Sequence, residues 1–525
     1  MEYRSSVGMR SRDRFSRQND DWPEWLWGLG LVLAALLVLG TNLSVPLLQD
    51  GSEVELALQG KAIAASPHFP QDWLLISFDR PFDRHEFSLL SVLIAFAYRW
   101  GGINEAMTRW PIVGLATLSV FFLYRTGREV FARRSTAIIA AWIYLVLSPL
   151  VPLGRFALPT VASSCFALMT IWLTLRSRRD FRWTMGIGLG LSLLGLTQGG
   201  LAIILGGVVL SFLAWDTPRL LRSLYLWAGI LLGSFPFIGY ILLHSFSLTT
   251  FLALFPHSSI LLSQFYGLKI LCFALPGLCL GLSGLPVAIA DWNWGWAKLT
   301  LIWFSGAFIA ISLFSFSLES SLLLFPPLAL AGGAKLRDLL NSPSDREYSS
   351  WSFLAIALAL VAIISSVGFA SLFPLDRASA LICAAVALCL AMVALTIAQH
   401  DRQVLILLFW GMYLALFLLG STLPTQEFDS VSHLDSLLQS IRETPQNQVI
   451  YTSLQNQYSV FAFYSDRPIA TKTDLQLEQL WYEKKHPYVL LHRDRDRQII
   501  PNLNNAEILG TTSSENWLLQ RKRAP

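Results

Sequence analysis

Long apolar stretches separated by short polar connections run along most of the chain. A membrane-spanning helix needs about 20 apolar residues, and the first such stretch is Trp25–Leu48. Leu89–Trp100 is apolar but too short to span, so we expect a helix lying along the membrane surface. Twelve further stretches predict spans, about thirteen in all: Ala106–Tyr124, Thr136–Leu153, Thr160–Leu175, Trp183–Thr197, Gly200–Trp215, Leu224–Leu243, Phe265–Ala290 (broken by Pro276 and Pro286), Leu299–Phe316, Leu322–Ala334, Trp351–Phe373, Ala378–Ala398 and Val404–Leu419.

Basic residues gather on alternate connections, which predicts the orientation of the chain. Five arginines precede the first span, and residues 125–134, 176–182, 219–222 and 335–346 are rich in arginine or lysine. Positively charged loops stay on the cytoplasmic side. We therefore expect an integral plasma-membrane or inner-membrane protein with a cytoplasmic N-terminus, and an odd number of spans places the C-terminus outside the cytoplasm.

The polar segments divide the chain into three parts. Residues 1–24 form a basic cytoplasmic tail, residues 25–422 form the transmembrane domain with an outer loop at 49–88, and residues 423–525 form an extracytoplasmic soluble domain. In that last part, Val431–Ile441 has the periodicity of an amphipathic helix and Leu475–Tyr482 predicts a second helix. Gln448–Thr452 and Tyr488–Leu491 read as strands, so we expect a small α/β domain.

Composition and charge narrow the class of protein. Of the 525 residues, 54% are hydrophobic and only 14% are charged, against about 25% charged in soluble domains. This excludes a soluble enzyme, a disordered protein and a disulfide scaffold. The net charge of +4 gives no support to nucleic-acid binding, and the five cysteines lie in apolar stretches without metal-ligand spacing.

Carboxylates are concentrated in the first outer loop rather than in the spans. The near absence of charges within the spans disfavours an ion-coupled transporter. Asp50, Glu53 and Glu55 lie close together in the loop, and Ser52 with Glu55 fits a capping box at a helix start. A carboxylate at a low-dielectric surface can act as a general base, so Asp50 and Glu53 are candidates for that role.

Several short segments between Val45 and Trp215 carry a more specific signal. They are Ser52-Glu53-Val54-Glu55-Leu56-Ala57, His85-Glu86-Phe87, Gly101-Gly102-Ile103-Asn104-Glu105 with Arg109-Trp110-Pro111, Gly127-Arg128-Glu129-Val130-Phe131, Gly154-Arg155-Phe156-Ala157-Leu158 and Leu196-Thr197-Gln198-Gly199-Gly200. With the order of one helix, an acidic outer loop, a surface helix and a basic inner loop, they resemble the GT-C membrane glycosyltransferases. The resemblance is to the protein O-mannosyltransferases and lipid A aminoarabinose transferases. Those proteins carry Asp-Glu-x-x-Tyr-Ala at the first of these places and Leu-Thr-Lys-Gly-Pro at the last.

The resemblance implies an inverting transfer of a sugar from a polyprenyl-phosphate carrier to a lipid, glycan or protein acceptor at the outer face. Glu53 or Asp50 would deprotonate the acceptor. Cationic side chains would hold the lipid phosphate, because a leaving group with developing charge needs positive partners. The expected substrate contacts are Arg80, Arg84, His85, Arg155, Thr160 and Gln198.

Departures from the family motifs leave a second interpretation open. Ser52 replaces the aspartate of the Asp-Glu pair, Thr160 stands at a second loop aspartate, and Gln198 replaces a lysine. The alternative is a catalytically silent polytopic protein that binds or moves lipid-linked glycans. No cofactor or resident metal is indicated, although a divalent cation held partly by the substrate phosphate is compatible with the sequence.

Overall fold

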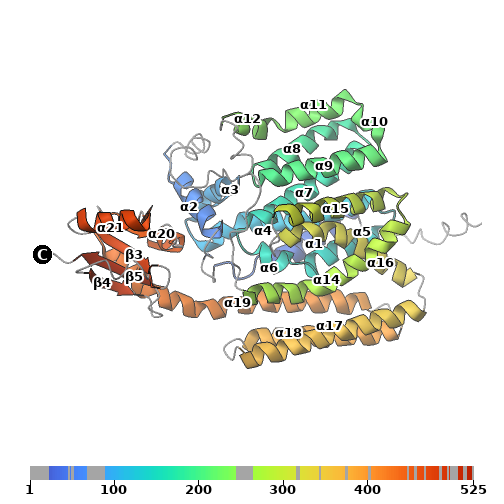
Figure 1. Ribbon diagram of the computed structural model, residues 1–525. Coiled ribbons are helices and arrows are strands. Elements are labelled where there is room, and N and C mark those ends of the chain that lie inside the picture. The colour runs from blue at the N-terminus through green and yellow to red at the C-terminus, as the bar shows by residue number, and fades with distance from the viewer. Residues whose placement is uncertain are drawn as a thin grey trace, which may run out of the picture.

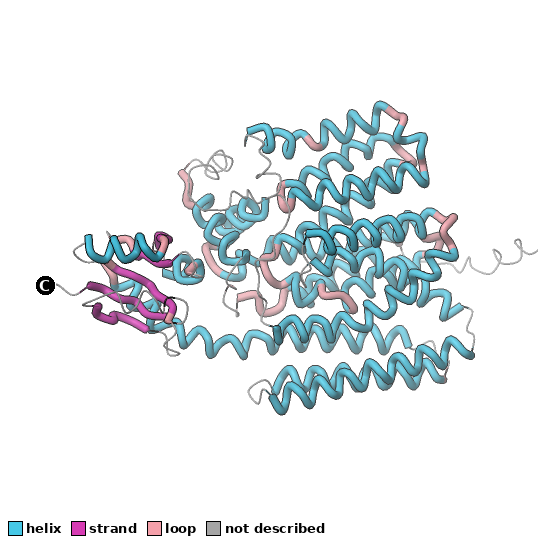
Figure 2. The backbone as a smooth tube through the Cα atoms, in the orientation of Figure 1, coloured by secondary structure: helices cyan, strands magenta, loops and turns pink. Residues whose placement is uncertain are grey.

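A helical bundle and one small sheet make up the described part of the chain (Figures 1 and 2). The computed structural model describes residues 23–44, 48, 52–67, 89–243, 264–314, 320–341, 345–372, 377–399, 404–445, 448–453, 458–465, 467, 469–483, 487–493, 496, 506–511 and 517–522. The helices of the N-terminal half are α1 (Glu24–Leu39), α2 (Ser52–Ala64), α3 (Leu89–Gly101), α4 (Glu105–Val130), α5 (Arg134–Val146), α6 (Leu150–Gly154), α7 (Pro159–Ser177), α8 (Thr184–Gly195), α9 (Gly199–Asp216), α10 (Pro218–Leu221), α11 (Leu224–Gly233) and α12 (Phe235–Leu243). They are followed by α14 (Gln264–Ala290), α15 (Gly295–Phe314), α16 (Phe325–Asn341), α17 (Asp345–Leu372), α18 (Arg377–Ala398) and α19 (Val404–Glu443).

The bundle has the apolar helices that the hydropathy pattern predicts. Among the described residues, α4, α9 and the Leu381–Ala398 part of α18 are long and apolar enough to cross a membrane by length and composition, and further apolar helical segments are shorter. A continuous buried core runs through α1, α4, α5, α7, α9 and α16. The α2–α3 end of the bundle, where these two helices pack on each other, faces the C-terminal sheet (Figure 1).

Proline and glycine positions explain where the helices differ from the predicted stretches. The first helix ends at Leu39 rather than Leu48, with Gly40 as its C-cap residue. Three residues beyond its end, Asn42 takes a positive φ of 52°, which a right-handed helix cannot include. The stretch Thr136–Leu153 splits into α5 and α6 ahead of Leu150, where Pro149 interrupts the helix.

Helix α14 shows the opposite behaviour. The predicted break at Pro276 and Pro286 is wrong, since α14 is one helix across both. Neighbouring helices can support proline in an apolar helix, and α14 packs closely on α16. At Gly284 an added Cβ would meet the backbone of Ala331, so only glycine permits this approach.

The C-terminal domain is a five-stranded sheet of order β2-β1-β3-β5-β4. Its strands are β1 (Ile450–Ser453), β2 (Ile469–Lys472), β3 (Tyr488–His492), β4 (Ala506–Thr511) and β5 (Trp517–Lys522). Strands β1, β2 and β3 are parallel, and β5 pairs antiparallel with β3 and β4. Leu437 and Ile441 of α19 pack on one face of the sheet, and Trp481 packs on the other.

The predicted elements of this domain are confirmed. Strands β1 and β3 lie at the two expected positions, and α21 (Asp474–Glu483) lies at the expected second helix. The expected amphipathic helix is the end of α19, which continues unbroken for 40 residues from the last apolar segment. The proposed boundary at residue 422 therefore falls inside one helix, which joins the bundle to the sheet (Figure 1).

Candidate functional site

An ion pair between Glu53 and Arg109 lies at the α2–α3 end of the bundle. Arg109 Nε is 2.8 Å from Glu53 Oε1, and Arg109 Nη2 is 3.1 Å from Oε2, so the pair is bidentate. Glu53 is 1% exposed and Arg109 is fully buried. Two charges removed from water need both good geometry and further hydrogen bonds. The contact joins the first turn of α2 to the second turn of α4.

Those further hydrogen bonds come from two other segments. Ala157 N–H donates to Glu53 Oε1 at 3.1 Å, and Arg109 Nη1 donates to the Leu43 carbonyl at 2.9 Å. The Arg109 guanidinium also lies 5.5 Å from the centre of the Phe156 ring. The pair thus ties together the segment after α1, helix α2, helix α4 and the turn between α6 and α7.

Arg155 belongs to the same turn and is 8% exposed. Its Nη2 donates to the carbonyl and hydroxyl oxygens of Thr41, in the segment after α1. Among the sequence-predicted residues, the structure therefore brings Arg155 and Glu53 into one neighbourhood, because Ala157, two residues after Arg155, donates to Glu53.

Thr160 and Gln198 lie along the next part of this end. Thr160 is 6% exposed in the first turn of α7, directly after Pro159. One turn later, Ser163 Oγ donates to Gln198 Oε1 at 2.8 Å. The predicted residue Gln198 precedes α9, and its amide is therefore tied to α7.

The capping-box interpretation of Ser52 is not supported by the geometry. Helix α2 begins at Ser52, and Ser52 Oγ is buried without a hydrogen-bond partner among the described residues. The remaining predicted site residues, Asp50, Arg80, Arg84 and His85, lie outside the described residues.

The C-terminal domain also reaches this end of the bundle, which the sequence analysis missed. Lys61 Nζ of α2 donates to the Phe463 carbonyl of α20 (Ser459–Ser465) at 3.1 Å. Leu48 N–H donates to Tyr464 Oη at 3.1 Å. Arg109 was quoted within a motif, but its role as the partner of Glu53 depends on a contact between residues 56 positions apart.

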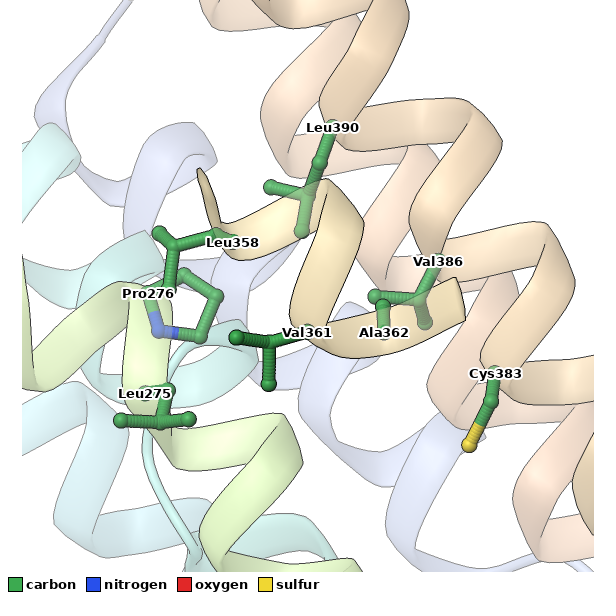
Figure 3. A pocket seen from close by; sticks show the side chains of 8 residues that line it. All are labelled: Leu275, Pro276, Leu358, Val361, Ala362, Cys383, Val386 and Leu390. Atoms are coloured by element: carbon green, nitrogen blue, oxygen red, sulfur yellow. The ribbon is translucent and has the colours of Figure 1, made fainter. Parts of the chain in front are cut away.

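Neither a metal cluster nor a polar pocket stands out in the described part of the chain. No three His, Cys, Asp or Glu side chains there gather into a possible metal site. An apolar hollow lies between α14, α17 and α18, and it offers aliphatic side chains, a proline ring and one thiol but no acid or base (Figure 3). Its lining residues are Leu275, Pro276, Leu358, Val361, Ala362, Cys383, Val386 and Leu390.

Comparison with known proteins supports the resemblance seen in the sequence. Residues 88–242 match the family model described as dolichyl-phosphate-mannose-protein mannosyltransferase. A search of curated proteins found no similar sequence. The matched segment spans α3 to α12 and includes Arg109, Arg155, Thr160 and Gln198.

Solved structures show the same fold over almost the whole chain. The chain resembles ArnT from Cupriavidus metallidurans in the apo state, with a TM-score of 0.74, 16% identity, and coverage of 95% of this chain and 98% of ArnT. The ArnT structure bound to undecaprenyl phosphate gives a TM-score of 0.73, 18% identity, and coverage of 96% and 99%. The archaeal oligosaccharyltransferase AglB from Archaeoglobus fulgidus, in complex with an inhibitory peptide and a dolichol-phosphate, gives 0.51, 11% identity, and coverage of 90% and 70%. The fold is that of the GT-C membrane glycosyltransferases.

Proposed function

We propose that this protein is an integral membrane glycosyltransferase that moves a sugar from a polyprenyl-phosphate carrier to a lipid, glycan or protein acceptor at the outer face of the membrane. The observation that carries the proposal is the agreement in fold, over nearly the full length of both chains, with an ArnT structure bound to undecaprenyl phosphate. The match of residues 88–242 to a family whose description names a dolichyl-phosphate donor adds independent support from the sequence.

In this proposal the ion pair of Glu53 and Arg109 has a structural role, because it holds α2 and α4 together at the site. Both carboxylate oxygens of Glu53 accept hydrogen bonds, and the residue is buried. A general base must reach the proton that it removes, and Glu53 has no open face for an acceptor. Of the two candidates from the sequence, this leaves Asp50, which precedes Glu53 by three residues, as the proposed base.

The reaction is a displacement at the anomeric carbon of the sugar. The base takes the proton of the acceptor hydroxyl or amine, the acceptor atom forms a bond to the anomeric carbon, and the bond from that carbon to the phosphate oxygen breaks. Attack opposite the leaving group inverts the configuration. The lipid phosphate leaves with the electron pair of the broken bond, so positive partners near it lower the barrier.

Arg155 is the described cation best placed to hold the lipid phosphate. It lies at the α2–α3 end, four residues before α7 begins at Pro159, and the positive end of a helix dipole favours an anion there. The sequence adds three further candidates for contacts to the lipid phosphate, which are Arg80, Arg84 and His85 of the outer loop. Thr160 and Gln198 contact the substrate, and a divalent cation carried in with the phosphate would add charge.

The orientation follows from the charge pattern. The N-terminal tail and the arginine-rich connections lie in the cytoplasm, and the sheet domain and the α2–α3 end lie outside it. In the apolar hollow of Figure 3, an acyl or prenyl chain would find only compatible side chains.

One observation favours a second candidate function, the binding or moving of lipid-linked glycans without chemistry. The one described carboxylate of the Asp-Glu motif is committed to Arg109, and Ser52 stands where the family has its aspartate. A chain that has lost its base would keep the fold and the phosphate site.

The test uses membranes that contain the native protein and a radiolabelled polyprenyl-phosphate sugar pool. Transfer of label to a water-soluble or lipid acceptor, absent in membranes that lack the protein, supports the transferase. Binding of undecaprenyl phosphate without transfer from any polyprenyl-phosphate sugar supports the silent carrier. Neither binding nor transfer would contradict both functions.

A further inference from the structure

The C-terminal domain touches the transmembrane domain through a short helix, α20. Lys61 of α2 donates to the Phe463 carbonyl, and its ammonium lies 5.2 Å from the centre of the Phe463 ring. On the other side of α20, Arg442 of α19 donates to the Tyr464 carbonyl at 2.9 Å. Helix α20 is therefore held between α2 and α19, although Lys61 and Phe463 are 402 residues apart in the sequence.

Tyr464 lies between the two hydrophobic cores of the molecule. Its half-buried ring packs against the core of the transmembrane domain and also against the core under the sheet. Its phenol meets two groups of the transmembrane domain. Leu48 N–H donates to Tyr464 Oη at 3.1 Å, and the Glu105 carboxylate lies near enough to raise the pKa of the phenol.

Glu105 connects this contact to the buried ion pair. It is the first residue of α4, and Arg109 follows it by four residues, so the two lie on the same face of the helix. The Arg109 charge also acts on the Tyr464 phenol. Burial raises the pKa of Tyr464 well above its ordinary value, and the Glu105 charge adds to the shift.

We propose that Tyr464 is a positioning residue through which the C-terminal domain holds helix α2 and the Glu53–Arg109 pair in their working arrangement. The segment before α2 is then fixed at two points, by Arg109 at the Leu43 carbonyl and by Tyr464 at the Leu48 amide. For its effect on catalysis this inference rests on the proposed function, but its structural part does not.

The test compares Tyr464→Phe with Tyr482→Phe in the full-length protein in lipid nanodiscs, by hydrogen exchange and mass spectrometry. The first variant keeps the ring and removes the phenol oxygen, and the second removes a phenol from α21, where Tyr482 is 60% exposed. A net hydrogen bond of about 1 kcal/mol corresponds to about a fivefold change in opening. We expect Tyr464→Phe to speed exchange of the α2 amides about fivefold without changing β1 and β3, and Tyr482→Phe to leave α2 unchanged.

A second variant removes the other contact between α2 and α20, the hydrogen bond from Lys61 to the Phe463 carbonyl. Lys61→Met keeps the aliphatic stem and removes the ammonium, and we expect it to speed α2 exchange in the same way. Unchanged α2 exchange in Tyr464→Phe would overturn the proposal. Equal loosening of β1 and β3 would also overturn it, because Tyr464 would then be only a core residue of the sheet domain.

Kinetics separate positioning from simple packing. If the native protein transfers sugar, we expect Tyr464→Phe to lower kcat about fivefold and to leave the KM for the donor unchanged. The reason is that the phenol contacts the segment before α2 rather than the lipid donor. An unchanged kcat would overturn the positioning role. If the native protein transfers no sugar while Tyr464→Phe still speeds α2 exchange, the proposed function fails and the structural coupling by Tyr464 stands.

Discussion

Glu53 and Arg109 form a buried bidentate ion pair that closes the α2–α3 end of the bundle, with Arg109 Nε 2.8 Å from Glu53 Oε1. The carboxylate that the sequence marks as a candidate base is therefore also the acceptor that compensates a fully buried guanidinium. The stability of the folded protein therefore depends on a candidate site residue, because removal of either partner leaves the other charge uncompensated in a low-dielectric environment.

The first prediction concerns the stability that depends on this pair. Glu53→Gln should lower the free energy of unfolding by about 3–5 kcal/mol, because the Arg109 charge stays buried without a counter-charge. The double variant Glu53→Leu/Arg109→Met should recover much of that loss, since both charges are then absent. Thermal unfolding in detergent measures the differences.

A more exposed pair on the other side of the bundle is the matched control. Arg128 and Glu24 are 2.6 Å apart, with side chains 25% and 44% exposed. Glu24→Gln should therefore cost less than about 1 kcal/mol. If Glu53→Gln were as stable as the native protein, the pair would not have the structural role assigned to it.

The second prediction tests Arg155 as a phosphate contact. Arg155→Lys should weaken binding of undecaprenyl phosphate by roughly tenfold, because lysine cannot bridge Thr41 and a phosphate with a planar, forked set of donors. Fluorescence titration with the lipid measures the dissociation constant. Arg467→Lys, in the C-terminal domain, is the control and should bind as the native protein does. Equal affinities for Arg155→Lys and the native chain would remove Arg155 from the phosphate site.

The third prediction concerns orientation in the membrane. Leu475 of α21 is 74% exposed, and Phe181, in the arginine-rich connection between α7 and α8, is 52% exposed. A membrane-impermeant maleimide should label Leu475→Cys in intact cells and Phe181→Cys only after permeabilisation. The native chain is the background control, with Cys165 and Cys383 buried. The reverse labelling pattern would contradict an extracytoplasmic sheet domain.

Most of the helical architecture could be predicted from the sequence, because hydrophobic length and periodicity are local properties. The exceptions depend on neighbours. Pro276 and Pro286 remain within a continuous α14, whereas Pro149 lies at the break between α5 and α6, and proline alone does not distinguish these contexts. Strands β2, β4 and β5 were missed because pairing, rather than a strong local pattern, organises them: β2 pairs with β1, β5 with β3, and β4 with β5.

The candidate site was predicted less completely. Sequence comparison selected Glu53, Arg155, Thr160 and Gln198, and the structure places them at one end of the bundle. It could not show that Glu53 is paired with Arg109, or that Tyr464 reaches the same place, since these contacts join residues far apart in the chain. The motif Arg109-Trp110-Pro111 was the available signal for the first of them.

The most direct test of the account measures sugar transfer from a radiolabelled polyprenyl-phosphate sugar by the purified protein in nanodiscs, in three forms. The native protein should turn over, and Asp50→Asn should lose about 10²-fold or more, as expected when a general base is removed. The double variant Glu53→Leu/Arg109→Met, compared at equal folded fraction, should lose more turnover than Tyr464→Phe, roughly tenfold, but clearly less than Asp50→Asn. No transfer by the native protein, or transfer that survives in Asp50→Asn and disappears in the double variant, would contradict the account.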